Sequence, residues 1–183
     1  VPNKLISGKE GLGMALFTDD KPREECGLFG IYAPEQEVAK ITYYGLYALQ
    51  HRGQESAGIA VADGHRIRHH KAMGLVSEIF SDQILQELSG EMAIGHVRYS
   101  TRGASLPTNA QPLVGYFQNG MIALAHNGNL TNAVELRDEL ANQGTVFQTT
   151  TDSELILNTI ARYRRHSLED AILKTMLDLR GAY

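Results

Sequence analysis

The residues of this chain that could carry chemistry begin with its only cysteine, Cys26. A thiol becomes a nucleophile when a base removes its proton, so any thiol chemistry must take place at this position. Cys26 precedes the segment Leu28–Ala33, whose apolar residues are typical of a buried strand. Gly27 between them would let other groups approach the backbone closely. The alternative interpretation is that Cys26 is a small buried apolar residue, as lone cysteines usually are.

Three polar clusters interrupt the apolar pattern further along the chain, and functional sites are expected at such local inconsistencies. The first is Gln50–Ser56, which also fits a solvated helix end. The second contains Arg98, whose planar guanidinium suits a carboxylate; the competing interpretation is an internal ion pair with Asp or Glu. The third contains Asn127 and Gly128, which fit a simple turn but could also supply the two donors of an oxyanion hole.

Asp152 adds a carboxylate at an expected helix start, where aspartate commonly caps the first backbone N–H groups. The seven histidines show no metal-ligand spacing with the cysteine, and the neighbours His69 and His70 would point to opposite faces of a strand. We therefore expect no metal site in this chain. His96 and His126 are the histidines that could serve as a base for the thiol.

Composition narrows the classes of protein and partner. The chain has 183 residues, of which 43% are hydrophobic and 21% charged, as in an ordinary globular protein with one sizeable core. Its 17 basic and 21 acidic residues give a net charge of -4, which offers no general attraction for nucleic acid. No apolar run reaches the roughly 18 residues that span a bilayer, so no membrane partner is expected. A single cysteine fits a reducing, cytoplasmic compartment.

The periodicity of apolar residues predicts paired strands and separate helices, which indicates the α+β class. The expected strands are 28–33, 56–62, 67–73, 92–99, 111–117, 121–126 and 146–148. The first expected helix begins at residue 38 and is closed by Arg52 and a glycine C-cap at Gly53. The other expected helices are 81–88, 132–143 with Val134 on its apolar face, 152–163 and 168–179. Within 92–99, the two-residue period of a strand places His96 and Arg98 on one face.

Residues 1–25 contain too few apolar side chains for a core element and are interpreted as a flexible leader. They also lack the basic segment followed by an apolar segment that marks a secretory signal.

Five segments, in order along the chain, resemble the class II glutamine amidotransferases. They are residues 26–30, 49–59, 95–101, 125–130 and 151–154. Within that family, the second and third segments are similar to the members that attach ammonia to phosphoribosyl diphosphate at the start of purine synthesis. The resemblance extends from Cys26 to the end of the chain.

This resemblance implies an N-terminal nucleophile hydrolase fold, in which two antiparallel sheets lie between helices as an αββα sandwich. It implies that glutamine is hydrolysed to glutamate and ammonia, with Cys26 as the nucleophile and its own α-amino group as the proton shuttle. Asn127 and the Gly128 amide would then form the oxyanion hole. A thiol with a pKa near 8.5 and an α-amine with a pKa near 8 are well matched for proton exchange.

The same resemblance assigns the substrate contacts. Arg98 would bind the α-carboxylate of glutamine, and Asp152 would bind its α-ammonium group. Thr101 would belong to the same substrate-binding segment, and Arg52 would link this site to the partner site. One cation and one anion are a natural minimum for a zwitterionic ligand.

The domain boundaries follow from the same comparison. Residues 1–25 would be a propeptide, because an α-amine on Cys26 exists only after the Glu25–Cys26 bond is cut. Residues 26–183 would be a glutaminase domain that is truncated at its C-terminal end, without the phosphoribosyltransferase domain. In the longer enzymes, magnesium binds with phosphoribosyl diphosphate, some members hold a 4Fe-4S cluster, and a homo-oligomer, a tetramer, is expected. None of these cofactors is expected in this chain.

Other interpretations remain open. Another class II amidotransferase, such as a glucosamine-6-phosphate synthase, is the nearest, although the sequence of residues 50–53 and the absence of Trp after Arg98 argue against it. A hydrolase that pairs Cys26 with a histidine would need no cleavage. An uncleaved glutamine-binding module would use Arg98 and Asp152 without catalysis.

Overall fold

The computed structural model describes residues 26–99, 105–117, 120–163, 165 and 167–183. The architecture is mixed α+β with antiparallel sheets, which confirms the expected fold class at this level. The expected leader, residues 1–25, and the candidate Thr101 lie outside the described residues. No helix within these ranges is long and apolar enough to cross a bilayer.

The larger sheet has four strands in the order β1-β4-β2-β3, and all of its neighbours are antiparallel. Its strands are β1 (Gly27–Tyr32), β2 (Ser56–Ala62), β3 (Ile67–Met73) and β4 (Met92–Arg98). Because β4 lies between β1 and β2, Val97 faces Gly27 on one side and Ala57 on the other. The end of β4 therefore meets the beginnings of both neighbouring strands.

Three helices cover one face of this sheet. They are α1 (Val38–Leu49), α2 (Val76–Ile79) and α3 (Asp82–Glu87). The core between helices and sheet includes Leu46, Ile59 and Val97, all fully buried. Since Val97 points toward α1, its neighbours His96 and Arg98 lie on the opposite face of β4, which confirms the expectation from strand periodicity.

The second half of the chain builds a region with a core of its own. Its strands are β5 (Leu113–Phe117), β6 (Gly120–Leu124), β7 (Asn129–Leu130) and β8 (Gly181–Ala182), and its helices are α4 (Ala133–Asn142), α5 (Asp152–Arg162) and α6 (Leu168–Asp178). Strand β5 pairs with β6, and β7 pairs with β8. The core contains Leu140, Leu155 and Ile160, and it shares no buried residue with the first core.

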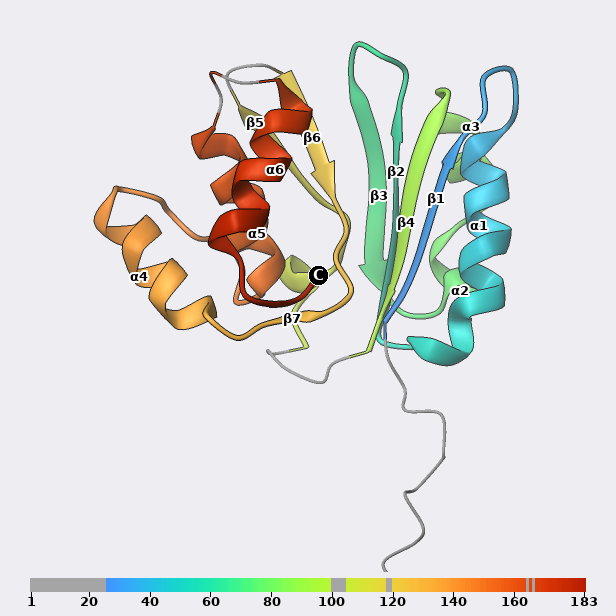
Figure 1. Ribbon diagram of the computed structural model, residues 1–183. Coiled ribbons are helices and arrows are strands. Elements are labelled where there is room, and N and C mark those ends of the chain that lie inside the picture. Colours follow the sequence, from blue (N-terminus) through green and yellow to red (C-terminus); the bar gives the residue numbers. More distant parts are fainter. Residues whose placement is uncertain (1–25, 100–104, 118–119, 164, 166) are drawn as a thin grey trace, which may run out of the picture.

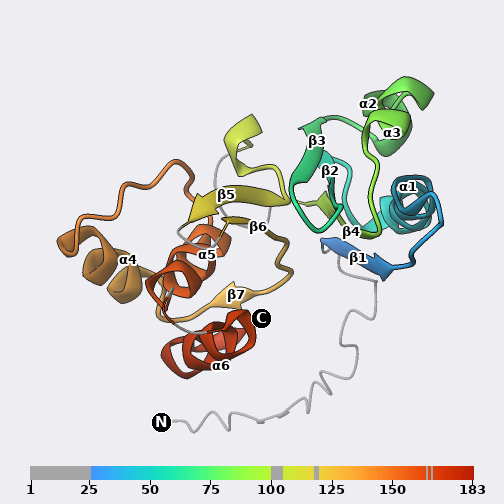
Figure 2. The same ribbon diagram turned by 90° about the horizontal axis from the view of Figure 1, so that it is seen from above.

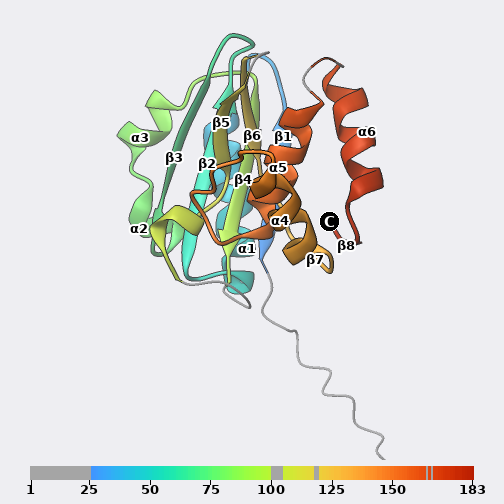
Figure 3. The same ribbon diagram turned by 90° about the vertical axis from the view of Figure 1, so that its left-hand side faces the viewer.

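The elements lie in successive layers (Figure 1). Helices α1 to α3 lie on one side of the larger sheet, and the β5–β6 ribbon lies on the other side, followed by α5 (Figure 2). Seen from that side, α4 and α5 lie in front of the strands, and α6 lies beside them (Figure 3). A mostly apolar cavity of about 430 Å³ lies between the sheets, lined among others by Ile67, Ile94 and Met121.

Gly53 differs from its predicted role. It is not a left-handed C-cap of α1, because its backbone is extended (φ -152°, ψ 117°) and a short 3-10 helix, η1 (Gln50–Arg52), separates it from α1. Close packing explains the glycine instead: a Cβ would lie 2.7 Å from the carbonyl carbon of Val97 and 2.8 Å from backbone atoms of Arg98. The segment after α1 therefore packs directly against the end of β4.

Two predictions in the second region are wrong. Val134 is 73% exposed, so it lies on the solvent side of α4 rather than in the core. Residues 146–148 do not form a strand. The N–H groups of Gln148 and Thr149 each donate to the carboxylate of Glu154 at 2.8 Å, and these bonds replace strand pairing.

Candidate active site

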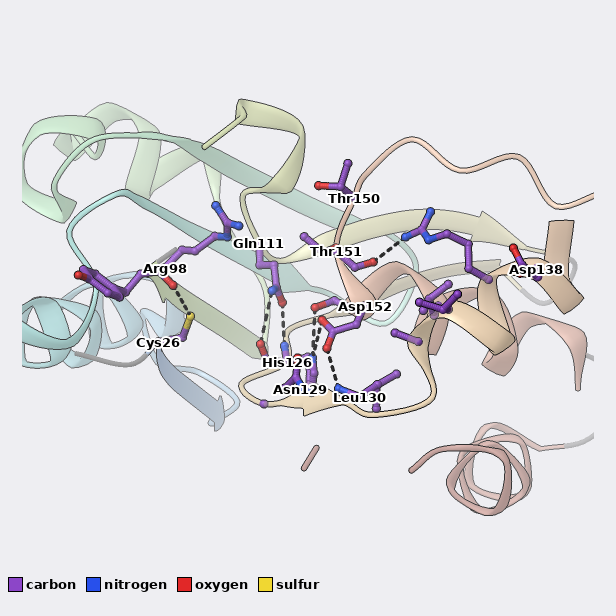
Figure 4. Close-up of a pocket in the computed structure, with 17 residues that line it drawn as sticks. Cys26, Arg98, Gln111, His126, Asn129, Leu130, Asp138, Thr150, Thr151 and Asp152 are labelled. Atoms are coloured by element: carbon purple, nitrogen blue, oxygen red, sulfur yellow. Dashed lines mark hydrogen bonds and ion pairs between the residues drawn. The ribbon is translucent and has the colours of Figure 1, made fainter. Parts of the chain in front are cut away.

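A cavity of about 310 Å³ lies where the two regions meet, beside the beginning of β1, the end of β4 and the beginning of α5 (Figure 4). Four of the residues predicted from sequence line it: Cys26, Arg98, Gly128 and Asp152. The first two come from the larger sheet and the last two from the second region. The structure therefore brings together residues that are up to 126 positions apart, as 152 minus 26 gives.

Cys26 is partly buried and immediately precedes β1. Its thiol donates a hydrogen bond to the carbonyl of Tyr99 at 3.6 Å. Burial raises the pKa of the Cys26 thiol, and the hydrogen bond to Tyr99 and the positive charge of Arg98 oppose that rise. Close packing at position 27 leaves no room for a side chain, since a Cβ on Gly27 would lie 2.8 Å from the Val97 side chain. The thiol is thus fixed at the head of a tightly packed strand.

Two side chains converge on the backbone carbonyl of Cys26. The amide Nδ2 of Asn127 donates to that oxygen at 2.7 Å, and Nε of Arg52 donates to it at 3.4 Å. Asn127 lies between β6 and β7, and Arg52 is the last residue of η1. Both residues predicted from sequence are therefore direct neighbours of the cysteine, although they come from different regions.

Arg98 is the last residue of β4 and is almost fully buried. Its Nη1 donates to the carboxylate of Glu55, in an ion pair whose side chains are 5% and 14% exposed. The guanidinium also lines the cavity, and Figure 4 shows its side chain extending toward Gln111. The internal ion pair, which the sequence offered as the alternative to ligand binding, is present. A guanidinium carries five donors, so one ion pair does not exclude a second carboxylate.

Asp152 is the first residue of α5, whose N-cap is Thr151. Its carboxylate accepts a hydrogen bond from the N–H of Leu130 in β7 at 3.0 Å and lies 3.6 Å from Nδ1 of His126. Burial alone would raise the pKa of this carboxyl, but the His126 and Leu130 hydrogen bonds outweigh it and lower the pKa. Asp152 therefore presents a negative charge to the cavity. Its carboxylate is held by Leu130 and His126, and it does not act as the N-cap that its position at a helix start suggested.

The histidines that could have served as a base face other groups. His126 has Nδ1 near Ser153 Oγ and Nε2 near the Ala182 carbonyl, each at 3.3 Å. His96 is fully buried, and burial lowers its pKa to about 4. Within the described ranges, neither ring hydrogen-bonds to the sulfur of Cys26. In those same ranges no group of three or more His, Cys, Asp or Glu side chains is placed to hold a metal ion.

Three supporting residues were not predicted from the sequence. Gln111 brackets His126: its Oε1 accepts from the His126 N–H at 2.8 Å, and its Nε2 donates to the His126 carbonyl at 3.4 Å. Glu154 fixes the backbone just before α5. Glu55 pairs with Arg98. For Glu55 the signal was a carboxylate beside an otherwise apolar strand. Glu154 contacts backbone only five and six residues before it, but no periodic pattern marks that segment. The partner of Gln111 is 15 residues away.

Comparison with known proteins gives consistent matches. Residues 96–183 match the family model described as a glutamine amidotransferase domain. The chain is 54% identical over 156 residues to an amidophosphoribosyltransferase of Synechococcus elongatus, which covers 85% of this chain and 32% of that protein. It is 50% identical over 161 residues to the Bacillus subtilis protein of the same name, covering 87% of this chain and 34% of the relative. The chain thus spans about a third of the length of these relatives.

Two solved structures are also similar. One is the glutamine phosphoribosylpyrophosphate amidotransferase of B. subtilis in complex with ADP and GMP, with a TM-score of 0.78 and 47% identity over 85% of this chain and 33% of that one. The other is described as the allosteric regulatory enzyme of purine biosynthesis, with a TM-score of 0.80 and 48% identity over 85% of this chain and 34% of that one.

Proposed function

This chain belongs to the glutamine amidotransferase domains found in amidophosphoribosyltransferases, and from that premise we propose that it hydrolyses glutamine to glutamate and ammonia with Cys26 as the nucleophile. The observation that carries the proposal is the shared cavity: a thiol, a buried guanidinium and a carboxylate with a lowered pKa line one space of about 310 Å³. That set of groups suits an amino acid whose side chain ends in an electrophilic carbonyl.

We assign the amino-acid end of glutamine to Arg98 and Asp152. The guanidinium pairs with the α-carboxylate, and the Asp152 carboxylate pairs with the α-ammonium group. Both side chains line the cavity together with Cys26. Thr101 is proposed as a further substrate-side residue by resemblance. Arg52, whose Nε donates to the carbonyl of Cys26, is proposed to link this site to the partner site.

The proposed chemistry begins at the thiol of Cys26. The thiolate attacks the side-chain amide carbon, and the thiol proton passes to the α-amine of Cys26 when that amine is free. The carbonyl oxygen becomes an oxyanion, which Asn127 Nδ2 and the Gly128 N–H would stabilise. The intermediate collapses to a thioester as the nitrogen leaves with a proton as ammonia, and water then releases glutamate and restores the thiol.

Processing at Glu25–Cys26 is part of this proposal, because a peptide nitrogen cannot act as a base. The order of the layers, helices, sheet, sheet and helices, supports assignment to the αββα sandwich of N-terminal nucleophile hydrolases. By the same relationship, the ammonia would pass in the longer enzyme to phosphoribosyl diphosphate and form 5-phosphoribosylamine in purine synthesis. Assembly as a tetramer and a cytoplasmic location remain predictions.

The test combines mass and activity. Intact mass and N-terminal sequencing should place the terminus of the active chain at Cys26, and Cys26→Ala should release no ammonia from glutamine. Arg98→Ala should raise KM for glutamine steeply, because it removes ground-state binding. Activity in a chain that still begins at Val1 would contradict the amine mechanism, and retained turnover in the Cys26→Ala variant would contradict the nucleophile.

A further inference from the structure

Glu55 lies immediately before β2 and is held to the end of β4 through its backbone. Its N–H donates to the carbonyl of Arg98 at 3.1 Å, and its own carbonyl accepts from the N–H of Gly74 at 2.9 Å. Strand register places the next residue, Ser56, directly opposite Arg98. The backbone of Glu55 therefore cannot move away from Arg98 without breaking the pairing of β2 with β4.

The Glu55 side chain returns to the same arginine. Its Oε1 accepts from Nη1 of Arg98, and both side chains are largely withdrawn from solvent. Arg98 lines the 310 Å³ cavity, whereas Glu55 does not. The carboxylate thus contacts the guanidinium from outside the cavity rather than occupying the position of a ligand.

We propose that Glu55 is the positioning residue of the substrate-carboxylate site: it orients the Arg98 guanidinium so that its cavity side meets the α-carboxylate of the substrate. This inference rests on the proposed function and names how its recognition site is built. An arginine side chain loses rotamer freedom when it is fixed, and a residue that fixes it before binding removes that cost from the binding step.

The ion pair between Glu55 and Arg98 also neutralises the buried guanidinium when no substrate is bound. A buried guanidinium without a counter-ion is strongly unfavourable, so Arg98 needs an anion when no ligand is bound. Glu55 supplies that anion, and it does so from a residue that does not line the cavity. The opposite possibility is that Glu55 competes with the substrate for Arg98, and the two predict opposite effects when the carboxylate is removed.

The experiment compares two electrophiles on the purified full chain. 6-Diazo-5-oxo-L-norleucine carries the amino-acid end of glutamine and needs the carboxylate site, whereas iodoacetamide needs only the thiol of Cys26. In Glu55→Gln, the second-order rate constant for the glutamine analogue should fall about tenfold, because a hydrogen bond between charged groups is lost. The iodoacetamide rate, taken where the thiol is fully ionised, should stay within about twofold.

The matched control is Glu78→Gln, because Glu78 lies in the neighbouring α2 and its carboxylate accepts from the Leu75 N–H rather than from Arg98. It should react with both reagents as the parent does. Glu55→Asp keeps the charge on a shorter side chain and should recover part of the rate with the glutamine analogue, which a general loss of stability would not produce. Circular dichroism checks that each variant is folded.

The pH dependence of iodoacetamide labelling is a second readout, which a general loss of stability would not change in the same way. Burial is the main cause that raises the pKa of the Cys26 thiol, and the Glu55 carboxylate adds to it while Arg98 opposes it. Glu55→Gln should therefore move the pH midpoint of iodoacetamide labelling downward, and Glu78→Gln should leave it in place.

The outcomes are distinguishable. If Glu55→Gln reacts with the glutamine analogue as fast as the parent, or faster, the positioning role is wrong; a faster reaction would indicate competition. If the parent, with its terminus at Cys26, reacts with iodoacetamide but not with the glutamine analogue, the glutamine site itself is wrong, and the proposed function fails with it.

Discussion

The two regions of the molecule hold their parts of the cavity in different ways. In the region of the larger sheet, Cys26 and Arg98 are placed by strand pairing, because β4 is bonded to both β1 and β2. In the second region, Asn127 lies on irregular backbone between β6 and β7, and Asp152 lies at a helix start. Side-chain-to-backbone hydrogen bonds set the positions of that backbone.

This difference predicts two kinds of sensitivity. Pairing and close packing tolerate the loss of one hydrogen bond but do not tolerate added volume. A segment held by a few side-chain hydrogen bonds should respond in the opposite way, since each bond is a large part of what fixes it. The two cores share no buried residue, so each kind of damage should remain near its origin.

The largest effect on stability is expected when a buried side chain is truncated in each core in turn. Leu46→Ala in the first core and Leu155→Ala in the second should each cost about 3 kcal/mol, because both side chains are fully buried. Native-state hydrogen exchange should show the loss from Leu155→Ala mainly in amides of α4 and α5, with β2 and β4 much less affected. Equal loss in both regions would mean that they unfold as one unit and that the comparison fails.

A smaller effect should come from acidification of the first region. His96 is fully buried with neither ring nitrogen hydrogen-bonded among the described residues, and burial lowers its pKa to about 4. The unfolded chain binds this proton near pH 6.5 and the folded chain only near pH 4, so stability should fall as the pH drops through that window. Between pH 6.5 and pH 5 the loss should be about 2 kcal/mol.

Urea unfolding at several pH values measures this slope. His96→Phe should flatten it, whereas the exposed His65→Asn should leave it unchanged. A parent whose stability does not change between pH 6.5 and pH 5 would show that His96 finds a partner when protonated.

Sequence reasoning succeeded where the local pattern and the packing agree. The strands at 56–62 and 67–73 have the bounds that were predicted. The elements that were missed, α2, β7 and β8, have two to four residues, too few to show a period.

In the candidate site, residue type and order along the chain identified the residues that line the cavity, but they did not identify the residues that hold these side chains in place. Cys26, Arg98, Gly128 and Asp152 meet in one cavity as expected. Which carboxylate pairs with Arg98 could not be predicted, because Glu55 and Arg98 are 43 residues apart and strand register decides the contact. Gly53 is a second example. A role for this glycine was predicted from the sequence, but the backbone atoms that exclude a side chain there lie on β4, which is distant in the sequence.

Gly53→Ala tests the intolerance of the first region to added volume. Its Cβ would meet backbone atoms of Val97 and Arg98, which cannot rotate away, so the variant should lose about 2 kcal/mol of stability. Gly30→Ala in β1 is the matched control, because a Cβ there meets nothing within 4 Å. Thermal unfolding should show little change for Gly30→Ala. Similar losses in both variants would argue for a general effect of strand glycines rather than for close packing at the end of β4.

The smallest effect, and the one specific to the second region, is expected from Glu154→Gln. The Glu154 carboxylate accepts from the N–H groups of Gln148 and Thr149 and from the Thr149 hydroxyl, and a glutamine side chain would turn one acceptor into a donor facing another donor. The loss should be about 1 kcal/mol.

Glu139→Gln is the control, because its ion pair with Arg162 is 54% exposed on the glutamate side and contributes little. Since the affected backbone leads directly into Asp152, hydrogen exchange in residues 148–152 should rise while β4 stays protected. A rise in β4 as well would show that the sheet also depends on this bond, against the division of the molecule into two differently held regions.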